Sequence, residues 1–190
     1  MTDPKELVEQ ILAGDRGAFR TLIKEYQRLV SHVVFRLIPA GPDQEDLSQE
    51  VFIRVYQHLD RFRFDSKLST WIARIAYNTC LNFLEKKKLP LYDDLVTEED
   101  REFEPVAPDE TARPDFGFEA TETGVILQKE IEQLPAVYKT VLTLYHLEQM
   151  SYNEIADIMN MPVGTIKSHL FRARRLLKDK LLAKYQREEL

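Results

Sequence analysis

The sequence predicts an all-α protein, and three observations support this prediction. Apolar residues recur at steps of three and four through most of the chain, as they do on one face of an amphipathic helix. No segment shows the alternation of a strand, and there is neither an internal repeat nor a glycine-rich phosphate loop. The 190 residues suffice for one domain or two small ones, at roughly 100–200 residues per domain. A proline-containing acidic segment in the middle favours two small helical domains joined by a flexible linker.

The charge of the chain is distributed in three blocks. Residues 1–92 and 125–190 each carry a net charge of +2, whereas residues 93–124 carry −10, so the whole chain has −6. The acidic block also contains three prolines and no sustained apolar period, a composition typical of an extended linker. We therefore expect domains over 1–92 and 123–190 and a linker over 93–122. Composition alone leaves open whether that linker does more than tether two domains.

The first domain is expected to begin with two helices. Asp3 followed by Pro4 is typical of an N-cap and a first helical position, and Gly14 would end this helix. A second helix is expected over Arg16–Leu37, before Pro39 and Gly41. Its predicted buried face consists of Phe19, Ile23, Tyr26, Val30 and Val34.

Two further helices are expected in the first domain. The third covers about 43–59 and buries Leu47, Val51 and Val55. After a short loop, the fourth covers about 67–88, with an apolar face of Ile72, Ile75, Ala76, Thr79 and Phe83. Beside that face runs a polar stripe at a strict step of four, consisting of Arg74, Asn78, Asn82 and Lys86.

The second domain is expected to end in two helices joined by a tight turn. Helices over about 123–133 and 136–147 come first. Ser151 and Glu154 then form a capping box that opens a short helix ending at Met159. A turn over 160–162 precedes a long helix from Val163, whose apolar side is Ile166, Leu170, Ala173 and Leu177.

That last helix is strongly basic and is our first candidate nucleic-acid surface. Residues 163–187 contain eight Lys/Arg and a single acidic residue. A helix-turn-helix places the start of its second helix in the DNA major groove, with basic flanks on phosphates. The predicted base-facing residues are Thr165, Lys167, Ser168 and Phe171, and the predicted phosphate-facing residues are Arg172, Arg174 and Arg175. A merely solvated basic face is the alternative that charge alone would favour; the capping box and the turn spacing favour DNA.

The fourth helix of the first domain is the second candidate nucleic-acid surface. Asparagine is a poor helix former, so Asn78 and Asn82 in mid-helix suggest contacts with base edges or phosphates. Just before them, Phe62, Phe64 and Trp71 offer rings on which unstacked bases can rest. Phe62 and Trp71 can equally be core residues, and for Trp71 taken alone we favour the core.

The third helix carries acids and amides on its exposed face, including Asp46, Gln49 and Glu50, beside Phe52, which we expect to be exposed. A protein-contact patch and a solvated face are equally good interpretations of this pattern.

The sequence offers no support for an enzyme. The four histidines are scattered, the single cysteine lacks a partner motif, and there is no nucleophile constellation or Walker loop. We expect no metal, no cofactor and no small-molecule substrate. No apolar stretch approaches the roughly 18 residues of a membrane span and the first residues are too acidic for a signal peptide, so a cytoplasmic location without membrane insertion is expected.

Several motifs together resemble the extracytoplasmic-function (ECF) sigma factors of bacterial RNA polymerase. They are Asp46-Leu-Ser-Gln-Glu-Val-Phe-Ile-Arg-Val-Tyr, Phe64-Asp-Ser-Lys-Leu-Ser-Thr-Trp-Ile-Ala-Arg-Ile-Ala-Tyr-Asn, Leu134-Pro, Ser151-Tyr-Asn-Glu-Ile-Ala and Met161-Pro-Val-Gly-Thr-Ile-Lys-Ser-His-Leu-Phe-Arg-Ala-Arg. The resemblance covers both expected domains in the family's order. Response regulators have similar helix-turn-helix ends but lack the first two blocks.

The resemblance implies a promoter-specificity subunit of core RNA polymerase, contacting its β′ clamp helices and β flap. Asp46, Gln49, Glu50 and Phe52 fall where the family binds the β′ clamp helices. The residues that fall where it recognises and melts the minus-ten element are Phe64, Ser66, Lys67, Trp71, Arg74, Asn78, Asn82 and Lys86. Those that fall where it recognises the minus-thirty-five element are Pro162, Thr165, Lys167, Ser168, Phe171, Arg172, Arg174 and Arg175.

This chain departs from the family's pattern at two positions. Ile72 replaces the second tryptophan that housekeeping sigma factors carry, and His169 replaces a frequent basic residue. The resemblance also implies control by an anti-sigma factor. It further implies that the linker runs toward the RNA exit channel of the polymerase. There, the acidic residues of 93–122 can mimic a polyanion. In the free protein, they can instead shield the two DNA-binding faces. A free-standing helix-turn-helix repressor or response-regulator output protein is the rival interpretation.

Overall fold

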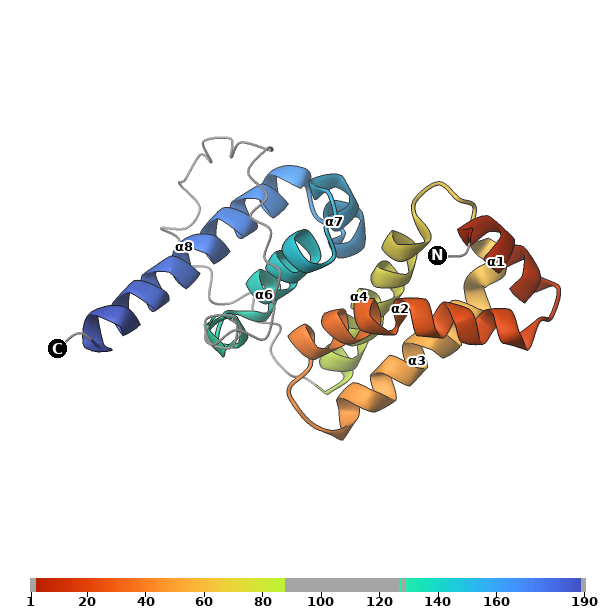
Figure 1. The fold of residues 1–190 in the computed structure, drawn as a ribbon, viewed down its shortest axis with the longest axis horizontal. Coiled ribbons are helices and arrows are strands. Elements are labelled where there is room, and N and C mark those ends of the chain that lie inside the picture. Colours follow the sequence, from red (N-terminus) through yellow and green to blue (C-terminus); the bar gives the residue numbers. More distant parts are fainter. Residues whose placement is uncertain (1–2, 88–126, 128, 189–190) are drawn as a thin grey trace. The chain divides into compact units, whose positions relative to one another are not determined.

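The protein is all-helical in the computed structural model, which describes residues 3–87, 127 and 129–188 (Figure 1). These described residues contain no strand, which confirms the predicted fold class. They divide into two compact units. The predicted linker over 93–122 and both of its boundaries lie outside the described residues. None of the described helices combines the length and the apolar character that crossing a membrane requires.

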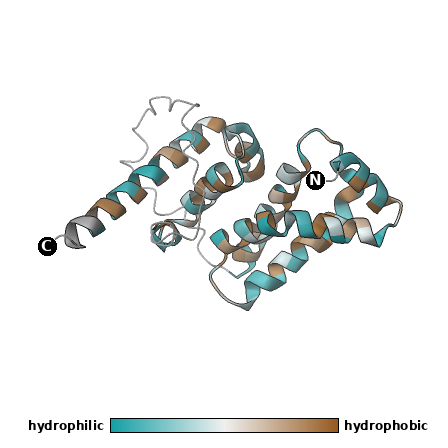
Figure 2. Ribbon diagram, in the orientation of Figure 1, coloured by the Kyte–Doolittle hydropathy of each residue, from teal (hydrophilic) through white to brown (hydrophobic). Residues whose placement is uncertain are grey.

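The N-terminal unit is built from four α-helices and a short 3₁₀ turn. The helices are α1 (Pro4–Leu12), α2 (Arg16–Leu37), α3 (Pro42–His58) and α4 (Leu68–Lys86), with η1 at Leu59–Arg61. Helices α2, α3 and α4 pack against one another, and α1 packs on α2. Apolar and polar segments alternate along α2 and α3 (Figure 2), as expected for helices with one buried side.

Local capping explains where α1 and α2 begin. The Asp3 carboxylate accepts a hydrogen bond from the Lys5 amide at 3.1 Å, directly before Pro4. Asp15 caps α2 by accepting from the amides of Gly17 and Ala18 at 2.7 and 3.3 Å. Each carboxylate satisfies amide groups that have no partner within the helix. The predicted span of α2 is confirmed, and the other predicted boundaries in this unit lie within two residues of the observed ones.

The buried face of α2 differs from the prediction. Val30 and Val34 are fully buried, but Phe19, Ile23 and Tyr26 are only half-buried. The core instead takes Ala18, Leu22, Leu29, Val33 and Leu37. The first half of the predicted stripe therefore lies at the rim of the buried face, where the Phe19 ring meets Tyr56 of α3 edge-on at 4.9 Å between centroids.

Helices α3 and α4 follow their predicted patterns more closely. Leu47, Val51 and Val55 are buried as predicted. On α4, Ile72, Ala76 and Thr79 are buried, whereas Ile75 and Phe83 are half-buried. The buried face is wider than predicted, because α4 packs against both α2 and α3, and it also includes Trp71, Ala73, Tyr77, Cys80 and Leu84.

The C-terminal unit contains α6 (Ala136–Leu142), a π-helical turn η4 (Thr143–Leu147), α7 (Tyr152–Met159) and α8 (Val163–Glu188). Residues 127 and 129–132 are also helical. The predicted helix over 136–147 is therefore correct in extent, but its last turn is a π-helix. Helix α8 packs on α6, and its predicted apolar side of Ile166, Leu170, Ala173 and Leu177 is buried.

Candidate nucleic-acid and protein-binding surfaces

Helices α7 and α8 form the helix-turn-helix that the sequence predicts. Both hydrogen bonds of the capping box are present: the Ser151 hydroxyl accepts from the Glu154 amide at 3.3 Å, and the Glu154 carboxylate accepts from the Ser151 amide at 2.8 Å. Asn160 ends α7 in the left-handed conformation with φ of 53°. Asparagine tolerates that conformation well, so the chain reverses there and α8 begins three residues later.

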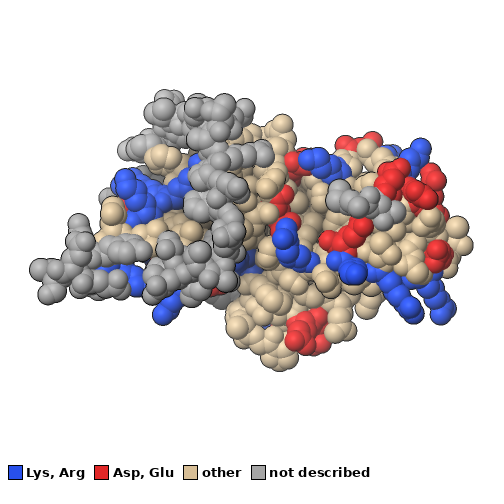
Figure 3. Space-filling model, viewed as in Figure 1, with Lys and Arg blue, Asp and Glu red and all other residues tan. Residues whose placement is uncertain are grey.

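The predicted DNA-facing residues of α8 all retain exposed surface. Pro162 and Arg175 are exposed, and the half-buried members are Thr165, Lys167, Ser168, Phe171, Arg172 and Arg174. Lys and Arg side chains gather over the middle of α8 (Figure 3). The Ser168 hydroxyl donates to the Gly164 carbonyl at 3.0 Å, which fixes its orientation on the first turns of the helix. The arrangement presents hydroxyl and basic groups together, as contact with a polyanion requires.

Two of these cations rest on a pair of stacked tyrosines. Tyr145 and Tyr152 lie 5.1 Å apart at an interplanar angle of 14°. The Lys167 ammonium lies 5.3 Å from the centre of the Tyr152 ring, and the Arg174 guanidinium lies 5.3 Å from the centre of the Tyr145 ring. Arg174 also donates to His146 Nε2, with its Nε at 3.4 Å. The sequence analysis did not single out these tyrosines, both of which are buried.

His169 lies inside the unit and not on the side of α8 that is predicted to face DNA. It is buried, and its ring lies 5.5 Å from that of Tyr138. The structure thus explains why a residue other than Lys or Arg is accommodated at this position of α8.

The polar stripe of α4 is exposed along its whole length. Arg74, Asn78, Asn82 and Lys86 are each exposed, one helical turn apart. The two asparagines therefore present amide groups to solvent between two cations, as the sequence predicts.

An aromatic ladder precedes this stripe. Phe62 and Phe64 lie 4.6 Å apart between ring centroids, and Phe62 and Trp71 lie 5.3 Å apart. Trp71 is only 9% exposed and Phe62 only 8%, whereas Phe64 is 45% exposed. The ladder thus joins the core to the surface, with Trp71 at its buried end and Phe64 at its exposed end.

Phe64 occupies an unusual backbone conformation. Its φ of 61° lies in the left-handed region, and this backbone conformation destabilises a residue with a Cβ by roughly 1–2 kcal/mol. Such outliers concentrate at functional sites, because the surrounding structure must hold them in place. The neighbouring Ser66 is half-buried and Lys67 is exposed, directly before α4 begins.

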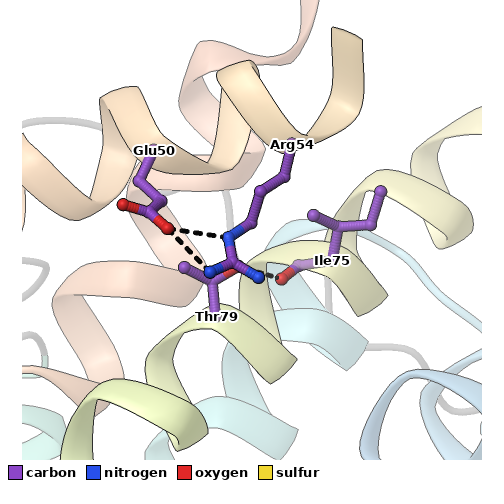
Figure 4. Close-up of polar contacts among 4 residues, drawn as sticks. All are labelled: Glu50, Arg54, Ile75 and Thr79. Atoms are coloured by element: carbon purple, nitrogen blue, oxygen red, sulfur yellow. Dashed lines mark hydrogen bonds and ion pairs between the residues drawn. The ribbon is translucent and has the colours of Figure 1, made fainter. Parts of the chain in front are cut away.

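The exposed face of α3 combines acids with apolar side chains. Asp46, Gln49 and Glu50 are exposed, while Phe52, expected to be exposed, is half-buried. The Glu50 carboxylate accepts hydrogen bonds from Arg54 Nε and Nη2 at 2.9 and 2.7 Å. Arg54 lies between Glu50 and the residues Ile75 and Thr79 of α4 (Figure 4). This pairing holds Glu50 in one place on the α3 face.

Two apolar residues of this face were missed in the sequence analysis. Ile53 is 57% exposed and Tyr56 is 56% exposed. They follow Gln49 at steps of four and seven, so they share its side of α3, and that spacing was the available signal. Exposed apolar side chains bordered by acids and amides are typical of a protein-contact surface.

The remaining titratable groups do not form a chemical site among the described residues. No cluster of three or more His, Cys, Asp or Glu side chains there is arranged to hold a metal ion. Cys80 is fully buried, and burial raises its pKa to about 12, so the thiol stays protonated.

A helix-turn-helix with a basic second helix in one unit, and an exposed amide-and-cation stripe in the other, are the features expected of a DNA-binding protein of two modules. Family comparisons agree with this class. Residues 22–89 match the Sigma-70 region 2 family, and residues 124–177 match the Sigma-70, region 4 family. The chain is 40% identical over 177 residues to the ECF RNA polymerase sigma-E factor of Escherichia coli strain K12, covering 92% of each chain. It is 37% identical over 186 residues to the RNA polymerase sigma-H factor of Pseudomonas aeruginosa, covering 97% of this chain and 96% of that one.

The chain belongs to the ECF sigma factors, which are transcription initiation factors. Solved structures show the same fold. One is CnrH in complex with the cytosolic domain of CnrY, with a TM-score of 0.63 at 19% identity, covering 93% of this chain and 96% of that one. Another is the sigma factor RpoE in complex with the anti-sigma factor NepR from Bartonella quintana, with a TM-score of 0.61 at 22% identity, covering 86% of this chain and 96% of that one.

Proposed function

We propose that this sigma factor binds core RNA polymerase and directs it to promoters by contacting two separate DNA elements. The observation that carries the proposal is that each described unit exposes one surface suited to DNA, the basic helix α8 in one and the polar stripe of α4 in the other. DNA opening needs no covalent chemistry from the chain. It requires binding of unpaired bases strong enough to offset unstacking, which costs a few kcal/mol.

Helix α8 would recognise the minus-thirty-five element in the major groove. Thr165, Lys167, Ser168 and Phe171 would face the bases near the start of the helix. Residues that would contact the phosphates are Arg172, Arg174 and Arg175, and Pro162 would border the element just before the helix. Lys167 or Arg172 to Ala should weaken promoter binding by about 1–3 kcal/mol if the lost contact is to a base. A contact to phosphate alone would instead lower the salt slope by about one and leave sequence preference unchanged.

The stripe of α4 and the aromatic ladder would bind the minus-ten element. Arg74, Asn78, Asn82 and Lys86 would contact the strand, and Ser66 and Lys67 would border the captured base. Phe64 offers the ladder's exposed ring as a stacking platform. Trp71 would support this platform from the core side, because it is almost completely buried against Phe62.

The α3 face would dock onto core polymerase through its β′ clamp helices, and the C-terminal unit onto the β flap. Asp46, Gln49 and Glu50 supply the polar part of this face, and Phe52 borders it. Ile53 and Tyr56 supply apolar area that a protein partner would bury.

Control by an anti-sigma factor completes the proposal. The RpoE structure with similar fold is a complex with an anti-sigma factor. The acidic segment 93–122, known here only from its sequence, would either mimic a polyanion within the polymerase or shield the basic surfaces of the free protein. Replacing its acids over 93–104 with Ser and Gln tests both roles through abortive synthesis and through DNA affinity of the free chain.

The decisive experiment is run-off transcription with bacterial core enzyme and a promoter library, with and without the purified chain. A gel shift with and without core polymerase separates a sigma factor from a free-standing helix-turn-helix repressor. Sequence-specific binding that needs the core enzyme supports the proposal. Tight operator binding by the chain alone, without any transcript from the holoenzyme, would refute it.

A further inference from the structure

We propose that Tyr152 and Tyr145 are positioning residues that hold the Lys167 and Arg174 side chains of α8 in the arrangement that DNA recognition requires. The inference rests on the proposed role of α8 at the minus-thirty-five element.

The four side chains form one column. Its order is Lys167, Tyr152, Tyr145 and Arg174, with successive separations of 5.3, 5.1 and 5.3 Å. The two cations come from α8, whereas the two rings come from α7 and from the π-helical turn η4. The column therefore links the DNA-facing helix to both elements that precede it.

The spacing along α8 places both cations on the same side of the helix. Residues seven apart are separated by two helical turns, or about 10.5 Å along the axis. Phe171 lies between them at steps of four and three. Each of the two cations has one ring of the tyrosine pair beneath it.

The π-helical turn supplies the second ring. A π-turn is rare and is frequently found at functional sites. Here it carries both Tyr145 and His146, and their rings meet edge-on at 4.9 Å between centroids. Arg174 contacts both residues, lying over the Tyr145 ring and donating to His146 Nε2. Arg174 is therefore fixed from two directions and anchors this end of the column.

Lys167 lies at the other end and is the cation that the column presents. A lysine side chain otherwise samples many rotamers, and this freedom is lost on binding DNA. The buried Tyr152 ring favours the rotamers in which the ammonium stays over it. Preorganisation of this kind increases affinity without adding any contact with DNA.

The test is a double-mutant cycle in the holoenzyme, measuring equilibrium binding to duplex DNA carrying the minus-thirty-five element. Four variants are needed: Tyr152→Phe, Tyr152→Met, Lys167→Ala and the double variant Tyr152→Met/Lys167→Ala. We expect Tyr152→Phe to bind within about 2-fold of the wild type, because the ring is kept. Tyr152→Met should bind about 5-fold more weakly, and the double variant no more weakly than Lys167→Ala.

The outcomes separate the inference from the proposed function. If Tyr152→Met weakens binding equally with and without Lys167, the tyrosine is merely structural and the inference is wrong. If Lys167→Ala leaves binding unchanged, the proposed role of Lys167 itself fails. A measurement on the unmutated chain covers the case in which Tyr152→Met does not fold. The Lys167 side-chain methylene protons nearest the ammonium should show an upfield ring-current shift in NMR spectra, and its absence would overturn the inference.

Discussion

Replacement of Phe64 by glycine separates two effects of this residue that oppose each other. The left-handed backbone at Phe64 costs roughly 1–2 kcal/mol for a residue with a Cβ, and glycine adopts it without that cost. Glycine in turn loses about 0.5–1 kcal/mol in chain entropy relative to alanine. Both Phe64→Gly and Phe64→Ala remove the ring contact with Phe62, worth about 0.5–1.5 kcal/mol. Phe64→Gly should therefore be more stable than Phe64→Ala by about 1 kcal/mol, and close to the wild type.

Trp71 provides the assay for this difference. It is the only tryptophan of the chain and lies in the same aromatic ladder, so its fluorescence reports unfolding of the N-terminal unit. A difference of about 1 kcal/mol corresponds to about 4–8 °C in Tm for a unit of this size. Equal stability of the glycine and alanine variants would refute the assignment of strain to Phe64.

The same two variants also test the stacking platform. Base stacking on an aromatic ring contributes about 1–3 kcal/mol, so both variants should reduce promoter opening roughly 5- to 150-fold. Phe64→Tyr keeps the ring and the strained backbone, and is the matched control that should open promoters normally. Permanganate reactivity of the minus-ten thymines measures opening directly. Normal opening by Phe64→Gly would contradict the platform, whatever its effect on stability.

Three further predictions concern both units. Lys184→Ala should destabilise the C-terminal unit by about 1–3 kcal/mol, because it leaves the buried Glu130 carboxylate without the ammonium that now lies 3.1 Å away. The control Lys180→Ala should lower the free energy of unfolding far less. Equal losses of stability for the two variants in urea unfolding would contradict this. Cys80 should react with iodoacetamide only as the unit unfolds, since burial raises its pKa to about 12 from 9.0, and fast labelling of the native protein would refute this. The free energy of unfolding should also fall as pH rises above 9, because only the unfolded thiol ionises there. Asn78→Ala should reduce promoter opening more than closed-complex binding, and equal losses in both assays would rule out its role in opening.

Local chemistry in the sequence was sufficient to predict the helices. Asp3 and Ser151 cap helices where the pattern predicts, because each interaction involves residues only two or three apart. The exposure of the polar stripe on α4 followed from its period for the same reason. The half-burial of Phe19 could not be predicted from the period, because the edge of a buried face depends on which helices pack beside it.

The geometry of the candidate sites depended on contacts distant in the sequence. The Arg174 side chain meets His146, which lies 28 positions earlier, and no periodicity within α8 contains that information. The π-helical turn also escaped prediction, since its residues fit an α-helical pattern equally well. The left-handed φ of Phe64 is a backbone property that the sequence around it gave no reason to expect.

In each unit, part of the proposed DNA-binding surface rests on buried aromatic rings. In one, Phe64 rests on Phe62, which packs on Trp71; in the other, Lys167 rests on Tyr152, which stacks on Tyr145. Rings suit this role because they fill a core at low cost in side-chain entropy and also offer a face to a base or a cation. Variants that keep such a ring but loosen its packing should therefore alter DNA binding before they unfold the unit. This order of effects distinguishes a supporting ring from an ordinary core residue, whose loss lowers stability and leaves the affinity of the folded fraction unchanged.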